Sequence, residues 1–183
     1  MKKEFKILLI ISIVVIVLMS VLITISKINF KKNMEKATFN MLITSIIADE
    51  VTRGYSDIWR AYIKTDRYNQ TYYKGEYHYF YDINAAIDFQ KNNYKQNGDL
   101  QKMDSLLIVS KIQVEKIEKS WFGNSDKKKC CINLYYDLWQ LCNEANSPTG
   151  SYETFNLECE LLSNSISRNI AELESYLPKW VFK

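Results

Sequence analysis

The first hydrophobic feature of the chain is an uninterrupted apolar run near its N-terminus. From Ile7 to Ile25 the sequence is ILLIISIVVIVLMSVLITI, nineteen residues without a charge. A helix over this run is roughly 28 Å long at about 1.5 Å per residue, close to the hydrocarbon thickness of a bilayer. In lipid the backbone must form its hydrogen bonds within the segment, so the β-branched residues do not prevent a helix. The run predicts one transmembrane helix over residues 7–26, behind a short basic tail at 1–6.

A cleaved signal peptide is the alternative for this segment, and the basic residues of the tail fit it. The apolar run is longer than the roughly 7–15 residues of a signal-peptide core, and no A-x-A cleavage site follows it. Thr24-Ile25-Ser26 is the best small-x-small candidate and is a poor one. The length of the run therefore favours a permanent signal anchor.

Behind the apolar run, hydrophobic positions recur in alternating steps of three and four. This heptad spacing predicts one long helix from about residue 28 to 65, continuous with the transmembrane segment, with a buried stripe along one side. Gly54 weakens such a helix by about 1 kcal/mol relative to Ala and is the expected place for a bend. The inward positions are Met34, Ala37, Met41, Thr44, Ala48, Val51, Tyr55, Ile58 and Tyr62, flanked by Leu42, Ile46, Trp59 and Ile63.

The segment from 66 to 81, DRYNQTYYKGEYHYFY, is polar and aromatic at once. We expect a connection broken at Gly75 and then a helix from about 76 to 97, with Tyr77, Phe80, Ile83, Ile87 and Tyr94 facing inward. A short strand at 77–81 is the alternative, because aromatic residues favour strands. The sequence Asn97-Gly98-Asp99 predicts a helix stop, a turn and an N-cap for the next helix.

Three further helices follow from the same spacing, ending near Gly123, near Asn146 and at Pro178, with Ser125 or Asp126 and Ser151 as N-terminal caps. Short loops favour antiparallel neighbours, so residues 27–178 are predicted to form an all-α, up-down bundle of four to five helices, followed by a C-terminal tail at 179–183. The inward positions are Leu100, Met103, Leu107, Ser110, Val114, Ile117 and Trp121; Cys131, Leu134, Leu138, Leu141 or Cys142, and Ala145; and Phe155, Cys159, Leu162, Ile166, Ile170, Leu173 and Leu177.

Composition and charge narrow the classes of function. Five Gly and two Pro are too few for an all-β sandwich with many tight turns. The N-terminal tail accounts for +2 of the net charge of +3, and the remainder of the chain holds 21 basic and 20 acidic residues. A domain so close to neutral has no basic footprint for nucleic acid, so DNA and RNA are not expected partners.

Lysines flank the apolar run on both sides, so the positive-inside rule gives no clear orientation. A short basic tail before a long apolar run usually stays in the cytoplasm, which places the domain outside. Lys27, Lys31, Lys32 and Lys36 then lie close to the outer leaflet, where they can neutralise anionic headgroups. Membrane lipid is the first expected partner.

The residues needed for catalysis are sparse. His78 is the only histidine and has no identifiable partner, the five glycines are isolated, and no acidic pair has the spacing of a helical metal site. We therefore expect no enzymatic activity, no cofactor and no metal. Cys142 and Cys159 lie on neighbouring predicted helices and could form a disulfide in a shifted register, although facing positions miss by about one helical turn. Small buried core cysteines are the alternative.

Tyrosine is the most suggestive residue type, because eight of the thirteen lie between Tyr55 and Tyr81. Tyrosine combines a large contact area with a polar tip and is favoured in binding surfaces. We therefore expect either a contact surface or a loop packed over the end of the bundle. The candidate contact residues are Tyr68, Tyr72, Tyr73, Tyr77 and Tyr79.

Together these features predict a non-enzymatic, single-pass cell-membrane protein with an extracytoplasmic binding, sensor or interaction module. In layout it resembles the helical sensor modules of bacterial receptors, at the level of architecture alone. The expected partner is another protein, either a membrane protein or a second copy bound through a coiled-coil face of the first helix. The alternative is a cytoplasm-facing membrane scaffold or accessory protein of a bacterial mobile element.

Overall fold

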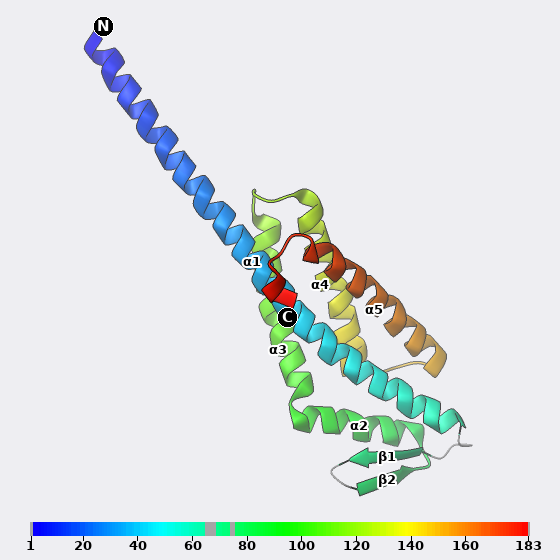
Figure 1. Ribbon diagram of the computed structural model, residues 1–183. Helices are drawn as coiled ribbons and strands as arrows, with labels where there is room; N and C mark the ends of the chain where they lie inside the picture. The colour runs from blue at the N-terminus through cyan, green and yellow to red at the C-terminus, as the bar shows by residue number, and fades with distance from the viewer. Residues whose placement is uncertain (1, 65–68, 74–75, 183) are drawn as a thin grey trace.

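The computed structural model describes residues 2–64, 69–73 and 76–182 and is mainly helical (Figure 1). The predicted helical class is confirmed, with one short β-hairpin added to it. In chain order the elements are α1 (Lys2–Lys64), β1 (Asn69–Tyr73), β2 (Glu76–Phe80), α2 (Ile83–Asn97), α3 (Asp99–Lys119), α4 (Ser125–Asn146), α5 (Tyr152–Glu174) and the short 3-10 helix η1 (Lys179–Phe182).

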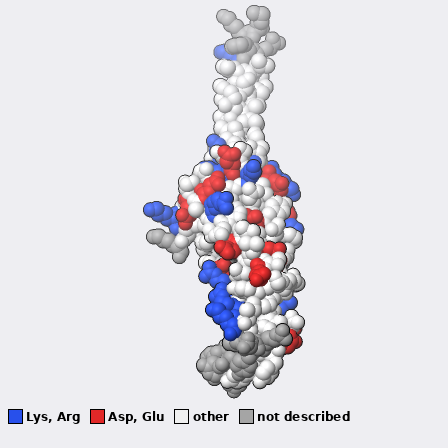
Figure 2. Space-filling model, turned by 90° about the vertical axis from the view of Figure 1, so that its right-hand side faces the viewer, with Lys and Arg blue, Asp and Glu red and all other residues white. Residues whose placement is uncertain are grey.

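The long helix α1 joins two different environments. Its apolar run protrudes from the bundle, with every side chain from Ile7 to Leu22 exposed, and forms an uncharged neck (Figures 1 and 2). Within the described residues this is the one helix long and apolar enough to cross a membrane. From Phe30 onward the same helix packs against α3, α4 and α5, and its far end packs against α2. The predicted continuity between the apolar run and the domain helix is therefore confirmed.

The heptad seam of α1 was predicted well, but its width was not. Eight of the nine seam positions, from Met34 to Ile58, are buried. The predicted flank at Ile46 and Ile63 is wrong, since both side chains are 60% exposed. The opposite flank is buried instead, through Thr38, Thr52 and Ser56. Thr52 can be buried there because its hydroxyl donates back to the Ala48 carbonyl of its own helix at 2.9 Å, whereas the buried Thr38 hydroxyl has no hydrogen-bond partner among the described residues.

The prediction of a helix from residue 76 is wrong, because 76–80 form a strand that pairs antiparallel with 69–73. The strand alternative was the better one, and its reason holds: aromatic residues suit a pleated, half-covered surface. Helix α2 starts at Ile83, capped by Asp82, whose carboxylate accepts a hydrogen bond from the Asn84 amide at 3.0 Å. A hydrogen bond of 3.2 Å from Tyr62 Oη to the Tyr81 carbonyl joins the hairpin segment to α1.

The ends of the other helices follow local signals in the sequence. Gly98 ends α2 with φ 85°, a conformation that glycine adopts without strain. Asn124 caps α4 in place of the predicted Ser125 or Asp126, accepting a hydrogen bond from the Asp126 amide at 2.7 Å. Ser151 caps α5 as predicted.

The inward face of α4 is buried at every predicted position. Trp121 was wrongly placed in the core: α3 ends at Lys119, so Trp121 leaves the helical stripe and is 71% exposed. The C-terminal residues pack on the bundle through η1, where Val181 is buried and the Trp180 ring lies 6.5 Å from that of Phe39 on α1.

Gly54 has a packing role that helix propensity does not predict. A Cβ at this position would collide with the Tyr94 hydroxyl, because α2 crosses α1 at close range here. We predict that Gly54→Ala lowers the free energy of unfolding by about 1–3 kcal/mol through overpacking, although Ala is the better helix former by about 1 kcal/mol. Tyr94→Phe removes the colliding oxygen, so the double variant should regain much of the loss. Thermal unfolding of the full chain in detergent measures both; a Gly54→Ala protein more stable than the parent would contradict the prediction.

Candidate functional site: a polar groove between α1 and α5

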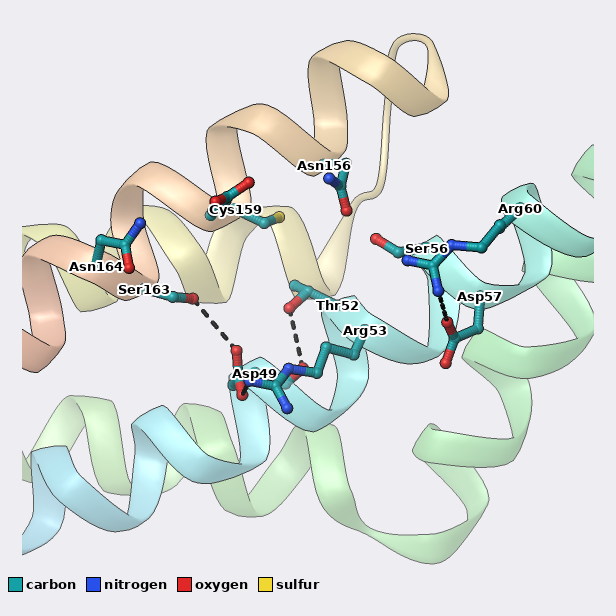
Figure 3. A pocket seen from close by; sticks show the side chains of 11 residues that line it. Asp49, Thr52, Arg53, Ser56, Asp57, Arg60, Asn156, Cys159, Ser163 and Asn164 are labelled. Atoms are coloured by element: carbon teal, nitrogen blue, oxygen red, sulfur yellow. Dashed lines mark hydrogen bonds and ion pairs between the residues drawn. The ribbon is translucent and has the colours of Figure 1, made fainter.

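A groove of about 390 Å³ lies on the bundle surface between α1 and α5 (Figure 3). Small side chains create it: Thr52 and Ser56 on α1 face Cys159 on α5, and none of the three is large enough to fill the space between the helices. The residues that line it are Asp49, Thr52, Arg53, Ser56, Asp57, Arg60, Asn156, Cys159, Glu160, Ser163 and Asn164.

Asp49 holds the two walls of the groove together. Its carboxylate pairs with Arg53 one turn along α1, at 2.9 Å, and accepts a hydrogen bond from Ser163 Oγ of α5, at 3.3 Å (Figure 3). The side chain of Asp49 is 31% exposed, so it is partly shielded from solvent. This carboxylate is therefore both a lining group and a link between α1 and α5.

Arg60 lies at the end of the groove nearest the C-terminus of α1. It pairs with Asp57 on the same helix at 3.2 Å, and its Nε donates to the Tyr152 hydroxyl of α5 at 3.3 Å. Both arginines of the groove are thus held by a carboxylate of their own helix. Their remaining guanidinium N–H groups can still donate to a ligand, because each arginine carries five donors.

The groove continues toward the half of the domain nearest the apolar run of α1 as a more apolar hollow. Ile46 on α1 and Ile166 and Ile170 on α5 line this part, while Asp49, Arg53, Ser163 and Asn164 belong to both parts. Donors and acceptors are mixed along the polar part, and an aliphatic strip lies beside them. Such an open surface suits a polar, partly apolar segment of another protein better than an enclosed small substrate.

The four cysteines are buried, free thiols, and the Cys142–Cys159 bond considered from the sequence is not formed. The two thiols face different helices: Cys159 lies against Thr52 of α1, whereas Cys142 lies near Asp104 of α3. Burial raises the pKa of each of the four thiols from 9 to about 12. They are therefore protonated near neutral pH and weak nucleophiles.

A second polar contact, between α4 and α5, was not predicted from the sequence. Asp137 accepts hydrogen bonds from Ser165 Oγ at 2.7 Å and from Asn169 Nδ2 at 3.1 Å. The Cys130 thiol donates to the Asn169 carbonyl at 3.3 Å. These residues lie on separate helices, and only the helix pairing brings them together.

The tyrosine-rich segment lies at the end of α1 far from the neck (Figure 1). Tyr68 falls outside the described residues, and Tyr72, Tyr73 and Tyr77 occupy strand positions in which Tyr72 pairs with Tyr77. Strand alternation puts positions 72, 77 and 79 on one face of the hairpin, and Tyr79 is 54% exposed. The predicted contact surface therefore stays a prediction.

The opposite face of the hairpin packs on α2. The rings of His78 and Phe80 lie 4.5 and 5.2 Å from that of Phe89, so His78 is a partly covered packing residue.

The predicted basic residues Lys27, Lys31, Lys32 and Lys36 are exposed where α1 passes from the apolar run into the bundle. Lys31 Nζ lies 4.0 Å from Glu35 Oε1.

Among the described residues no three His, Cys, Asp or Glu side chains gather closely enough to hold a metal ion. Comparison of the chain with protein-family models, with curated proteins and with solved structures gave no match.

The two carboxylates that pair with arginine on α1 should differ in their effect on stability. Asp49 also accepts a hydrogen bond from α5, so Asp49→Ala should cost about 1–2 kcal/mol of the free energy of unfolding. Asp57 is 68% exposed and pairs only within α1, so Asp57→Ala is the matched control and should cost less than about 0.5 kcal/mol. Chemical denaturation of the full chain in detergent measures the difference. Equal losses for the two variants would show that Asp49 does not link the helices.

The thiols should be unreactive until the bundle opens. In the folded protein, maleimide labelling of the four cysteines is expected to be slow from pH 7 to 9, because the buried thiols ionise only near pH 12. In denaturant, all four should label within the dead time of mixing. The raised pKa values also mean that the stability these thiols contribute is complete below about pH 9 and is lost between about pH 9 and 12. Rapid labelling of a native cysteine at pH 7 would contradict its burial.

Proposed function

We propose that this chain is a non-enzymatic, single-pass membrane protein whose helical bundle binds a partner protein outside the cytoplasm. The observation that carries the proposal is the continuity of α1, in which one uninterrupted helix provides the exposed apolar run and the central core helix. Between Ile7 and Ile25, fifteen large apolar side chains are exposed, which is unfavourable in water and favourable in hydrocarbon. A bilayer around residues 7–26 gives these side chains a suitable solvent.

In the proposed arrangement α1, α3, α4 and α5 form an antiparallel, up-down bundle whose first helix is also the anchor. The short connections α3–α4 and α4–α5 support alternating directions. The groove then runs along the side of the bundle, and the hairpin lies at the end farthest from the bilayer. Both surfaces remain accessible while the anchor is in lipid.

The groove is the proposed binding site because one of its two walls is α1 itself. A partner segment that contacts Arg53 or Arg60 touches the same helix that enters the membrane. Binding there can change the packing of α1 on α5 through the Asp49–Ser163 contact. The exposed face of the hairpin at Tyr79 is the second place at which a partner could bind.

The chemistry of the described side chains supports a binding role over catalysis. The thiols are protonated near neutral pH, and the single histidine packs on Phe89. The basic tail before the apolar run favours a domain outside the cytoplasm. A cytoplasm-facing scaffold is the alternative, and topology separates the two.

The test combines a topology probe with site-specific crosslinking in cells. Because the native thiols are buried, an exposed cysteine introduced as Ser147→Cys is the better probe of sidedness. An impermeant maleimide should label it in intact cells and should leave the parent protein unlabelled. Labelling only after permeabilisation would favour the cytoplasmic scaffold.

The groove is tested by placing a photo-crosslinking residue at Glu160 on its wall and, as a control, at the exposed Lys111 on α3. A defined adduct from position 160 and none from 111 is expected, and Asp49→Ala should weaken it. Equal adducts from both positions, or none from either, would remove the groove as the binding site.

A further inference from the structure

The loop between α3 and α4 lies at the end of the bundle from which the apolar neck emerges (Figure 1). It packs directly on α1: a Cβ at Gly123 would collide with the ring of Phe30, so glycine permits the closest approach of the loop to the helix. Gly123 also has φ 104°, which disfavours other residues. Lys128 donates a hydrogen bond to the Ser120 carbonyl and holds the loop against the start of α4.

The position of Phe30 fixes the height of this loop above the apolar run. Phe30 is five residues beyond Ile25 on one continuous helix, which is about 8 Å along the helix axis. The headgroup zone on each side of a hydrocarbon core is about 5–8 Å deep. With the apolar run in a bilayer, the α3–α4 loop therefore lies at the level of the headgroups.

The loop presents the kind of side chain that this zone favours. Trp121 is exposed, and its ring lies 4.4 Å from that of Phe122 between centroids, with the two ring planes tilted by 58°. Tryptophan is enriched at membrane–water interfaces, where its apolar ring and its N–H group can both be satisfied. No interior role explains an exposed tryptophan here, since α3 has already ended at Lys119.

Basic residues are also concentrated at this end of the molecule. Residues 27–36 and 116–129, the two segments at this end, hold nine lysines against three acidic residues. The remaining domain segments, 37–115 and 130–182, hold eleven basic against seventeen acidic residues. The near-neutral total therefore conceals a basic end beside the neck and an acidic remainder, although one face shows both signs mixed near the neck (Figure 2). Lysines beside an anionic leaflet contribute about 1 kcal/mol each.

We propose that the α3–α4 loop with the start of α4, residues 120–129, is a second membrane contact that inserts Trp121 among the headgroups of an anionic bilayer. The inference rests on the proposed membrane anchor. Two attachment points, the span and the loop, would fix the rotation of the bundle about α1. The groove and the hairpin would then face a constant direction relative to the bilayer.

The test uses the full chain in lipid nanodiscs, with a spin label on one introduced cysteine at a time. Ser125→Cys lies beside the loop, and Ser147→Cys follows the other end of α4, about 33 Å away along the helix, as the matched control. Ile16→Cys reports the anchor. Labelled protein without an introduced cysteine gives the background from the buried native thiols.

Collision of each label with oxygen and with a water-soluble nickel chelate gives its depth. Nanodiscs with about 30% anionic lipid provide a negatively charged bilayer surface. In these nanodiscs the Ser125 label should be several-fold less accessible to nickel than the Ser147 label. Trp121→Ala should abolish most of this difference, whereas Trp121→Phe should retain part of it. Purely zwitterionic nanodiscs should weaken it.

The outcomes separate the two proposals. If the Ile16 label is in hydrocarbon but the Ser125 and Ser147 labels are equally accessible to nickel, the loop contact is overturned and the anchor stands. If the Ile16 label is accessible to nickel, the anchor is overturned and the loop contact with it. Unchanged protection of Ser125 in a folded Trp121→Ala protein would also overturn the role of Trp121.

Discussion

The burial of one face of α1 against α3, α4 and α5 is the interaction on which the rest of the fold depends. Tyr55 lies at its centre: the ring packs edge-on against Tyr94 and Phe155, and the hydroxyl donates to the Ala145 carbonyl at 3.2 Å. A buried hydroxyl needs such a partner, so this one residue connects α1 to α2, α4 and α5. The other helices are positioned by what they bury against α1.

The interior polar groups follow one rule, which is that each is neutral or held by a partner. Burial keeps the thiols protonated, and Asp137 accepts two hydrogen bonds at the α4–α5 interface. The groove between α1 and α5 is a gap in the packing of these two helices, because the small side chains of Thr52, Ser56 and Cys159 leave space that larger side chains would fill. Such a gap costs packing contacts, which is why it is the surface that we assign to binding.

Hydrophobic periodicity predicted the features that are set within a single helix. It failed for the features that are set by the pairing of two segments. The seam from Met34 to Ile58 and the inward face of α4 follow from spacing alone. A strand near 77–81 was only the alternative to a helix, and its partner was not predicted, because residues 76–80 gain their hydrogen bonds from 69–73, which local spacing does not specify. The flank of α1 was misplaced for the same reason, since hydrophobicity favoured Ile46 while the packing of α5 buried Thr52. The groove contact between Asp49 and Ser163 spans 114 residues and has no local signal.

Because α1 is one uninterrupted helix, the spacing of its residues gives the distance of each part of the domain from the apolar run. Lys64 is 39 residues beyond Ile25, so with the apolar run in a bilayer the far end of the helix stands about 58 Å above the hydrocarbon boundary. A typical tilt of about 20° lowers that height by only about 6%. The hairpin at this end would therefore lie well beyond the lipid headgroups, and a partner lying flat on the membrane would meet the opposite end of the bundle instead.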